Sequence, residues 1–185
     1  LLLEAKRSDT GAQPLRRHVP WLAASGLVIL TMQIALGGWT SSNYAALACP
    51  DVPTCQGQWW PEDSNFAEGF VLWRGLGINY EFGVLDAPSR VAIHFAHRLG
   101  AVATFTMLLL IGLRFRARSQ AAALRWAATL VLGAVTLQVL IGAGVVWFGL
   151  PLTLATAHNA VAALLLLTMI NLNHAASFTA NRHPA

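Results

Sequence analysis

The chain has 185 residues, of which 56% are hydrophobic and 11% are charged, and its mean hydropathy is +0.54. Soluble domains carry about a quarter charged residues, so this composition argues against a soluble enzyme, and the abundance of apolar residues excludes a disordered chain. The formal net charge of +4 would suit a nucleic-acid-binding domain, but the distribution of the charges gives a different reason for it.

Three stretches without Lys, Arg, Asp or Glu mark where the chain can cross a membrane: 18–50, 99–113 and 126–181. About 20 helical residues span a bilayer, whereas the last stretch would be ~84 Å long as one helix, so it must fold back. Gly149-Leu150-Pro151 is the expected break. We therefore predict an all-α fold, an integral membrane four-helix bundle with antiparallel, up-and-down helices. The bundle forms a single domain, 1–185, with an outer loop at 41–89 and helices at about 20–40, 90–114, 121–148 and 151–173.

The basic residues lie mostly on one side of the predicted bundle. Nine of the twelve Lys and Arg residues fall in the N-terminal segment, the connection between the second and third helices, and the C-terminal tail. The loop at 41–89 has two of the others and six of the eight acids, and Arg98 lies inside a helix. Because the side richer in Lys and Arg faces the cytoplasm, we expect both termini there, in a bacterial inner membrane. The positive charge then reflects topology, and we expect no nucleic-acid partner.

The beginning of the chain does not look like a signal peptide. Leu1-Leu2-Leu3 is too short for the apolar part of such a peptide, and a charged segment follows it. Since the first residue is not Met, we expect the chain to be a fragment that follows a preceding element.

The long outer loop contains signs of local structure. Asn65, followed three residues later by Glu68, is typical of a capped helix start. The aromatic residues around it would lie on the bilayer surface or roof the bundle; they are Trp59, Trp60, Phe66, Phe70 and Trp73.

Both cysteines, Cys49 and Cys55, lie in this loop, on the side where disulfides persist. We expect a structural disulfide, with a redox-active pair as the alternative. A zinc site is not expected, because the loop has no histidine to complete a tetrahedral set with the two thiolates.

Three of the six histidines, His94, His97 and His158, lie inside the apolar helices, where an ionisable group indicates a functional site. The other three, His18, His174 and His183, lie at or beyond helix ends and are expected to be solvated or interfacial.

His97 and His158 each lie about ten ångströms from the outer end of their predicted helices, at ~1.5 Å per residue. Two histidines at one depth on two helices that run in the same direction can face each other, as a haem iron between two imidazoles requires. Small residues flank both histidines and leave room for a flat macrocycle. Two hydrogen-bonded packing histidines are the alternative.

Two further polar residues stand beside His97. His94 lies one helical turn nearer the outside, where it would touch a haem edge, relay protons or hydrogen-bond within the bundle. Arg98 is costly in a membrane unless it is paired, so it would reach a haem propionate or extend to the lipid headgroups.

A short repeat supports a symmetric arrangement. Gln33 to Gly37 (QIALG) and Gln138 to Gly142 (QVLIG) each precede a helix that carries a histidine near its outer end. This pattern indicates a pseudo-symmetric pair of hairpins with a cofactor on the axis.

Five segments together resemble one family: 33–39 (QIALGGW), 42–47 (SNYAAL), 49–57 (CPDVPTCQG), 97–101 (HRLGA) and 150–159 (LPLTLATAHN). They are similar to haem A synthase, the membrane enzyme of cytochrome oxidase assembly, and the resemblance covers about 20–173. It implies an eight-helix protein made of two related halves, and this chain resembles the C-terminal half. It also implies one haem per half, here a b-type haem with His97 and His158 as iron ligands.

The family oxidises a methyl group of haem O to the formyl group of haem A, so the resemblance implies an oxidoreductase. That oxidation is attributed to the N-terminal half, where a carboxylate precedes the first ligand by one turn; this chain has His94 there, which leaves its catalytic residues unknown. We expect the segment to bind haem without turning over alone. The implied partners are haem O, haem A or haem B, the missing N-terminal half and the bilayer, and a homo-oligomer stays open.

Two other classes stay open as well. A membrane b-type cytochrome would share the histidine pair without needing the cysteine loop. A quinone-linked thiol oxidase generally needs a second cysteine pair, and this chain has two cysteines in all.

Overall fold

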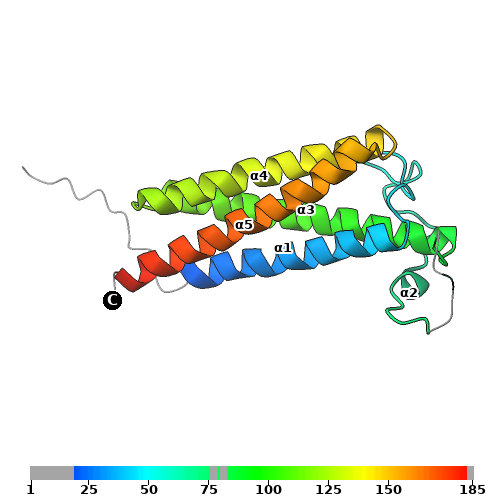
Figure 1. The fold of residues 1–185 in the computed structure, drawn as a ribbon, viewed down its shortest axis with the longest axis horizontal. Helices are drawn as coiled ribbons and strands as arrows, with labels where there is room; N and C mark the ends of the chain where they lie inside the picture. Colours follow the sequence, from blue (N-terminus) through cyan, green and yellow to red (C-terminus); the bar gives the residue numbers. More distant parts are fainter. Residues whose placement is uncertain (1–18, 76–78, 80–82, 183–185) are drawn as a thin grey trace, which may run out of the picture.

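The computed structural model describes residues 19–75, 79 and 83–182, with the side chains of 19 and 180–182 left out (Figure 1). Its helices are α1 Val19–Ser42, α2 Phe66–Gly69, α3 Ala87–Arg118, α4 Ala122–Trp147 and α5 Leu152–Arg182. The four long helices lie side by side, and successive ones run in opposite directions. The part of the chain that the structure describes contains no strand, only an isolated bridge between Cys55 and Gln58.

The four long helices are each long and apolar enough to cross a membrane. Large apolar side chains also cover the outside of the bundle, among them Val28, Val102, Leu140 and Leu167. Lipid, unlike water, accepts such a surface at no cost. The structure therefore confirms the predicted fold class, an all-helical membrane four-helix bundle.

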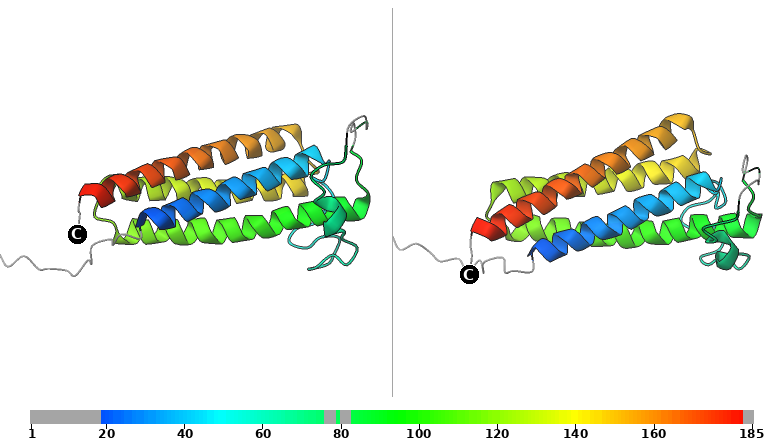
Figure 2. Two further views of the ribbon diagram at one scale, coloured as in Figure 1. Left: turned by 90° about the horizontal axis from the view of Figure 1, so that it is seen from below. Right: turned by 60° about the horizontal axis from the view of Figure 1, so that its bottom comes forward.

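The helices form a ring in the order α1, α3, α4, α5. α1 packs on α3 and α5, and α4 packs on the same two helices. α3 and α5 are diagonal to each other, and no pair of their Cα atoms comes within 8 Å. The connection between α1 and α3 gathers at one end of the bundle, together with α2 and the α4–α5 turn (Figure 2). We call this end of the bundle the loop end. We call the opposite end, where α3 connects to α4, the α3–α4 end.

The main apolar core fills the α3–α4 end of the bundle. Its buried members come from all four long helices, and they include Leu30, Leu108, Phe115, Val131 and Leu165. Asn173 of α5 adds a polar tie, because its Nδ2 donates to the carbonyl of Ala23 in α1 at 3.0 Å.

Two smaller buried clusters lie at the loop end, one around the two cysteines and the other around Ala45, Leu85 and Ile93. Between them and the main core lies a layer formed by 33–37, 97–100, 138–142 and 155–162. In the described residues, none of the buried members of the three clusters comes from this layer, although Ile34 packs on the main core and Val161 is buried.

The break between α4 and α5 lies where the sequence predicted it. Gly149 and Leu150 both take positive φ angles, 68° and 64°, and the N–H of Leu150 bonds back to the carbonyl of Val145 at 2.8 Å. This arrangement closes α4 with a left-handed turn, and Pro151 then precedes the first turn of α5.

Two predicted helix boundaries were wrong. The helix predicted at 90–114 is Ala87–Arg118, because Asp86 caps it by accepting from the N–H of Ser89 at 2.9 Å and Pro88 stands in its first turn. At its other end, the helix continues through Arg116 and Arg118. Their positive charges interact favourably with the negative end of the helix dipole. The helix predicted at 151–173 extends to Arg182. The prediction ended both helices near the end of the apolar run, whereas the backbone hydrogen bonds continue beyond it.

The close approach of α3 and α4 depends on Gly112. A Cβ at this position would lie 2.7 Å from both Cγ and Cδ2 of Leu132, whereas a Cβ at Gly133 of α4 would meet nothing within 4 Å. We expect Gly112→Leu to destabilise the protein by about 1–3 kcal/mol through overpacking. Thermal unfolding in detergent measures this effect. Gly133→Leu is the matched control, and equal loss in the two variants would contradict the packing argument.

Candidate functional site

The two histidines that the sequence singled out as a pair lie on the diagonal helices α3 and α5. The ring of His97 lies against Gly37 of α1, where a Cβ would be 3.1 Å from the His97 Cε1 atom. The ring of His158 lies in the same way against Gly142 of α4, where a Cβ would be 2.9 Å from Cε1. Each histidine therefore occupies a place that a larger residue on the neighbouring helix would fill.

A glutamine one turn before each glycine contacts the same histidine. Gln33 Nε2 donates to His97 Nδ1 at 3.0 Å and also to the His97 carbonyl at 3.0 Å. Gln138 Nε2 donates to His158 Nε2 at 3.2 Å. The two short segments that the sequence analysis paired thus meet equivalent partners, although sequence reasoning did not assign the glutamines a role.

The residues of this layer fit a haem. The two imidazoles come from diagonal helices whose Cα atoms stay more than 8 Å apart, and the layer around them contains small residues. His158 Nδ1 is buried and has no hydrogen-bond partner, which is costly unless a ligand uses its lone pair. Imidazole nitrogens are common haem ligands, so His97 and His158 are the residues that would hold the iron.

His94 and Arg98 form a second polar group, on the side of α3 that faces the outer loop. Arg98 Nη2 donates to the Cys49 carbonyl at 2.6 Å, and Nη1 donates to the carbonyls of Asp51 and Thr54, each at 2.6 Å. Arg98 Nε lies 3.2 Å from His94 Nε2. The guanidinium thus holds the loop, a role that the sequence did not predict, and its contact with a haem propionate stays a prediction.

His94 is only 4% exposed and lies between this arginine and the loop. The N–H of Cys49 points at its Nδ1 from 3.2 Å, while Arg98 approaches its Nε2. A neutral imidazole has one lone pair and one N–H, so only one of these contacts is a full hydrogen bond in a given tautomer. The position of His94 indicates a role in docking the loop on α3.

The segment that Arg98 holds is closed by a disulfide between Cys49 and Cys55, whose Cα atoms are 4.6 Å apart. Both cysteines are buried and pack on Val91 and Phe95 of α3. Inside this segment, the hydroxyl of Thr54 and the N–H groups of Gly57 and Gln56 hold the pKa of the Asp51 carboxyl below its usual range. The disulfide segment is therefore a compact unit that is attached to α3 by apolar packing and by Arg98.

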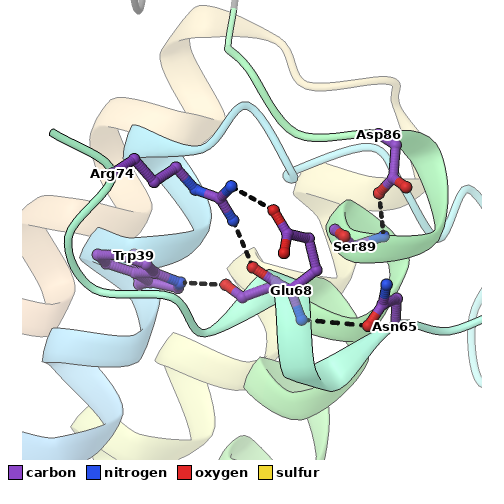
Figure 3. A network of polar contacts seen from close by, with 7 residues as sticks. Trp39, Asn65, Glu68, Arg74, Asp86 and Ser89 are labelled. Carbon is purple, nitrogen blue, oxygen red and sulfur yellow. Dashed lines mark hydrogen bonds and ion pairs between the residues drawn. The ribbon is translucent and has the colours of Figure 1, made fainter.

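The loop segment around α2 lies beside the start of α3, on which α2 packs (Figure 3). Asn65 caps α2 by accepting from the N–H of Glu68 at 3.1 Å, as the sequence predicted. Trp39 Nε1 donates to the carbonyl of Gly69 at 3.0 Å, and Arg74 forms an ion pair with Glu68. These contacts join the end of α1 to the loop segment around α2.

The aromatic residues of the loop divide between the two expected roles. Trp60 packs on Phe66 and meets Phe95 edge to face, with ring centroids 5.1 Å apart in the second pair, so it roofs part of the bundle. Trp59 and Trp73 are exposed.

The remaining histidines lie elsewhere. His174 is exposed near the far end of α5, where its ring stacks on Phe178. His18 and His183 lie outside the described residues.

Comparisons with known proteins agree with this picture. Residues 1–170 match a family model described as cytochrome oxidase assembly protein. The chain is 45% identical over 167 residues to a heme A synthase of Shewanella oneidensis, covering 90% of this chain and 48% of the relative. It is 30% identical to a heme A synthase of Roseobacter denitrificans, covering 87% of this chain and 37% of the relative. The chain thus spans about half the length of these relatives or less, and no solved structure is significantly similar to it.

The attachment of the disulfide segment to α3 can be tested at Arg98. Arg98→Leu leaves three loop carbonyls without their donor, and we expect a loss of stability on the order of 3 kcal/mol. Arg98→Lys should lose less, because an ammonium keeps the charge but not the fork geometry. Thermal unfolding in detergent measures both effects. Arg114→Leu, at an exposed position of the same helix, is the control, and an equal effect there would refute the role of Arg98.

Proposed function

The chain belongs to the family of cytochrome oxidase assembly proteins, and from this we propose that it is the C-terminal, haem-binding half of a haem A synthase-like membrane enzyme. The complete enzyme would be an oxidoreductase that converts a methyl group of haem O into the formyl group of haem A. The name of the relatives supports this proposal, and so does the fact that the chain aligns with about half of the Shewanella protein.

Within this half, His97 and His158 would bind the iron of one haem, for which we propose the b type. One observation carries this assignment: each imidazole lies against a glycine and a glutamine of the neighbouring helix. When bound there, a haem would supply one-electron transfer. The protein's own contribution is to hold the two rings on α3 and α5, each against a glycine and a glutamine of a neighbouring helix.

His94 and Arg98 would serve this site by keeping the disulfide segment in place. His94 is enclosed by α3 and the loop, so the structure does not favour it as a group that exchanges protons with a substrate. His97 and His158 would both be engaged as iron ligands, so neither would be free to assist an oxidant. We therefore propose that oxidation needs the N-terminal half, and that this half transfers electrons or stabilises the assembly.

The proposed topology follows from the charges. Both termini would face the cytoplasm of a bacterial cell, and the outer loop would face the oxidising side of the inner membrane. A disulfide in the outer loop agrees with this orientation.

A b-type cytochrome that only carries electrons is the second candidate. It is favoured by one observation: the pair of histidine ligands can be supplied by α3 and α5 of this chain alone. A quinone-linked thiol oxidase is disfavoured, because both cysteines are buried and bonded to each other, with 0% and 1% of their surfaces exposed.

The iron ligands are tested by absorption spectra of the purified membrane protein. His97→Ala and His158→Ala should each abolish the low-spin haem spectrum, since each removes one axial ligand. His174→Ala, at an exposed position on the same helix as His158, should keep it. A full low-spin spectrum in either of the first two variants would rule out the assignment.

Because we assign the oxidation to the N-terminal half, we expect that this segment does not oxidise haem by itself. Residues 1–185 would be expressed in cells that make haem O but not haem A, and extracted haems separated by chromatography. We expect haem A at the level of the empty-vector control. Haem A above that level would overturn the proposed division and make His94 the first residue to mutate.

A further inference from the structure

The α3–α4 end of the bundle carries positive charge that no acidic residue nearby balances. Three exposed arginines lie in the last two turns of α3 and one in the first turn of α4; they are Arg114, Arg116, Arg118 and Arg125. Every acidic residue that the structure describes lies between 51 and 86, at the loop end. Within the described part of the chain, these four guanidinium groups therefore have no carboxylate at their own end of the bundle.

Two of the four arginines lie where α3 packs on α4. Arg116 Nη1 donates to the Thr129 hydroxyl at 2.7 Å, and that hydroxyl donates in turn to the carbonyl of Arg125 at 2.9 Å. Because residues four apart share one face of a helix, the side chain of Arg125 lies on the same face of α4 as Thr129. Arg116 and Arg125 thus flank one line of contact between the helices, which we call the α3–α4 seam.

Two exposed tryptophans show how deep this seam lies in the membrane. Trp126 and Trp147 stand at the two ends of α4. The helix between them is about 32 Å long at ~1.5 Å per residue, close to the ~30 Å of the hydrocarbon layer. Tryptophan prefers the boundary between hydrocarbon and water. Arg125 directly precedes Trp126, so the arginines of the seam lie at the level of the lipid headgroups.

Towards the middle of the membrane, the seam continues as an open apolar surface. Gly133 lies one turn from Thr129 on the same face of α4, it is exposed, and a Cβ there would meet nothing within 4 Å. Leu113, one turn before Arg116 on α3, and Leu137, one turn after Gly133 on α4, are 49% and 48% exposed. A cationic place at headgroup level with an open apolar surface beside it matches the two parts of a phospholipid.

We propose that the α3–α4 seam binds an anionic phospholipid, whose phosphate contacts Arg116 and Arg125 and whose acyl chain lies over Gly133. The planar guanidinium can donate two parallel hydrogen bonds to a phosphate, and basic sites between membrane helices bind anionic headgroups. A zwitterionic headgroup would bring a cation of its own to the arginines, so the ligand carries a net negative charge. This inference does not depend on the proposed haem ligation.

The test is native mass spectrometry of the purified full chain in detergent, titrated with dioleoyl phosphatidylglycerol or with dioleoyl phosphatidylcholine, which has the same acyl chains. We expect one phosphatidylglycerol to bind, more tightly than phosphatidylcholine. Arg116→Gln combined with Arg125→Gln should weaken its binding on the order of 25-fold, because each arginine at a membrane surface contributes about fivefold. Gly133→Leu should also weaken binding, because it fills the place of the acyl chain without changing the charge.

The matched control is Arg114→Gln combined with Arg118→Gln, which removes the same charge from the same end of the bundle. Both residues are two positions from Arg116, or about 200° around α3, so they point away from the seam. We expect this variant to lose less than about threefold, because salt screens charges that do not contact the lipid.

Equal losses in the two double variants, or equal binding of the two lipids, would overturn the proposal, because the arginines would then act only as a diffuse charge. Full displacement of the lipid by inorganic phosphate would also overturn it, since the site would then recognise a free anion. If the Arg116 and Arg125 variant does not fold, Gly133→Leu decides: unchanged binding of phosphatidylglycerol would contradict the placement of the acyl chain, and weakened binding would support it.

Discussion

Inside a bilayer a polar side chain has no water to bond with, and this constraint organises the functional end of the bundle. The α3–α4 end is packed with apolar side chains, but the layer nearer the loop contains histidines and glutamines that must find partners in the protein. Each histidine meets a glutamine from the neighbouring helix, and two amide oxygens and one ring nitrogen are still left without partners. These unpaired atoms support the proposal that this layer binds a ligand.

The same constraint explains how the outer loop is attached to α3. Arg98 follows His97 directly in the sequence, and its charge is balanced by three carbonyls of the disulfide segment rather than by a carboxylate. Because neighbouring residues on a helix point in different directions, one turn of α3 serves two purposes: His97 faces α1, and Arg98 faces the loop. The disulfide keeps the carbonyls of this segment converged on the arginine. The loop is therefore attached to the helix that carries a proposed iron ligand, next to that ligand.

Much of this arrangement could be predicted from the sequence. Charge-free stretches predicted the four helices because charges are costly in lipid, and Gly149-Leu150-Pro151 predicted the α4–α5 break because glycine and proline interrupt helices. The ends of α3 and α5 were not predictable from hydropathy, since a helix continues beyond the membrane while its backbone bonds allow. The hydrogen-bond partners of Arg98 could not be predicted either, because they are backbone carbonyls, which every residue has. The glutamines had a signal in the repeated Gln-x-x-x-Gly spacing, but only the fold shows that both meet a histidine.

In the proposed site, His97 and His158 would hold one haem iron between α3 and α5. The haem content of the purified chain, together with its electron paramagnetic resonance spectrum, tests this site. We expect one haem per 185-residue chain and a low-spin ferric signal typical of two imidazole ligands. A chain that is folded but contains no haem, or a haem with a high-spin ferric signal, would contradict it.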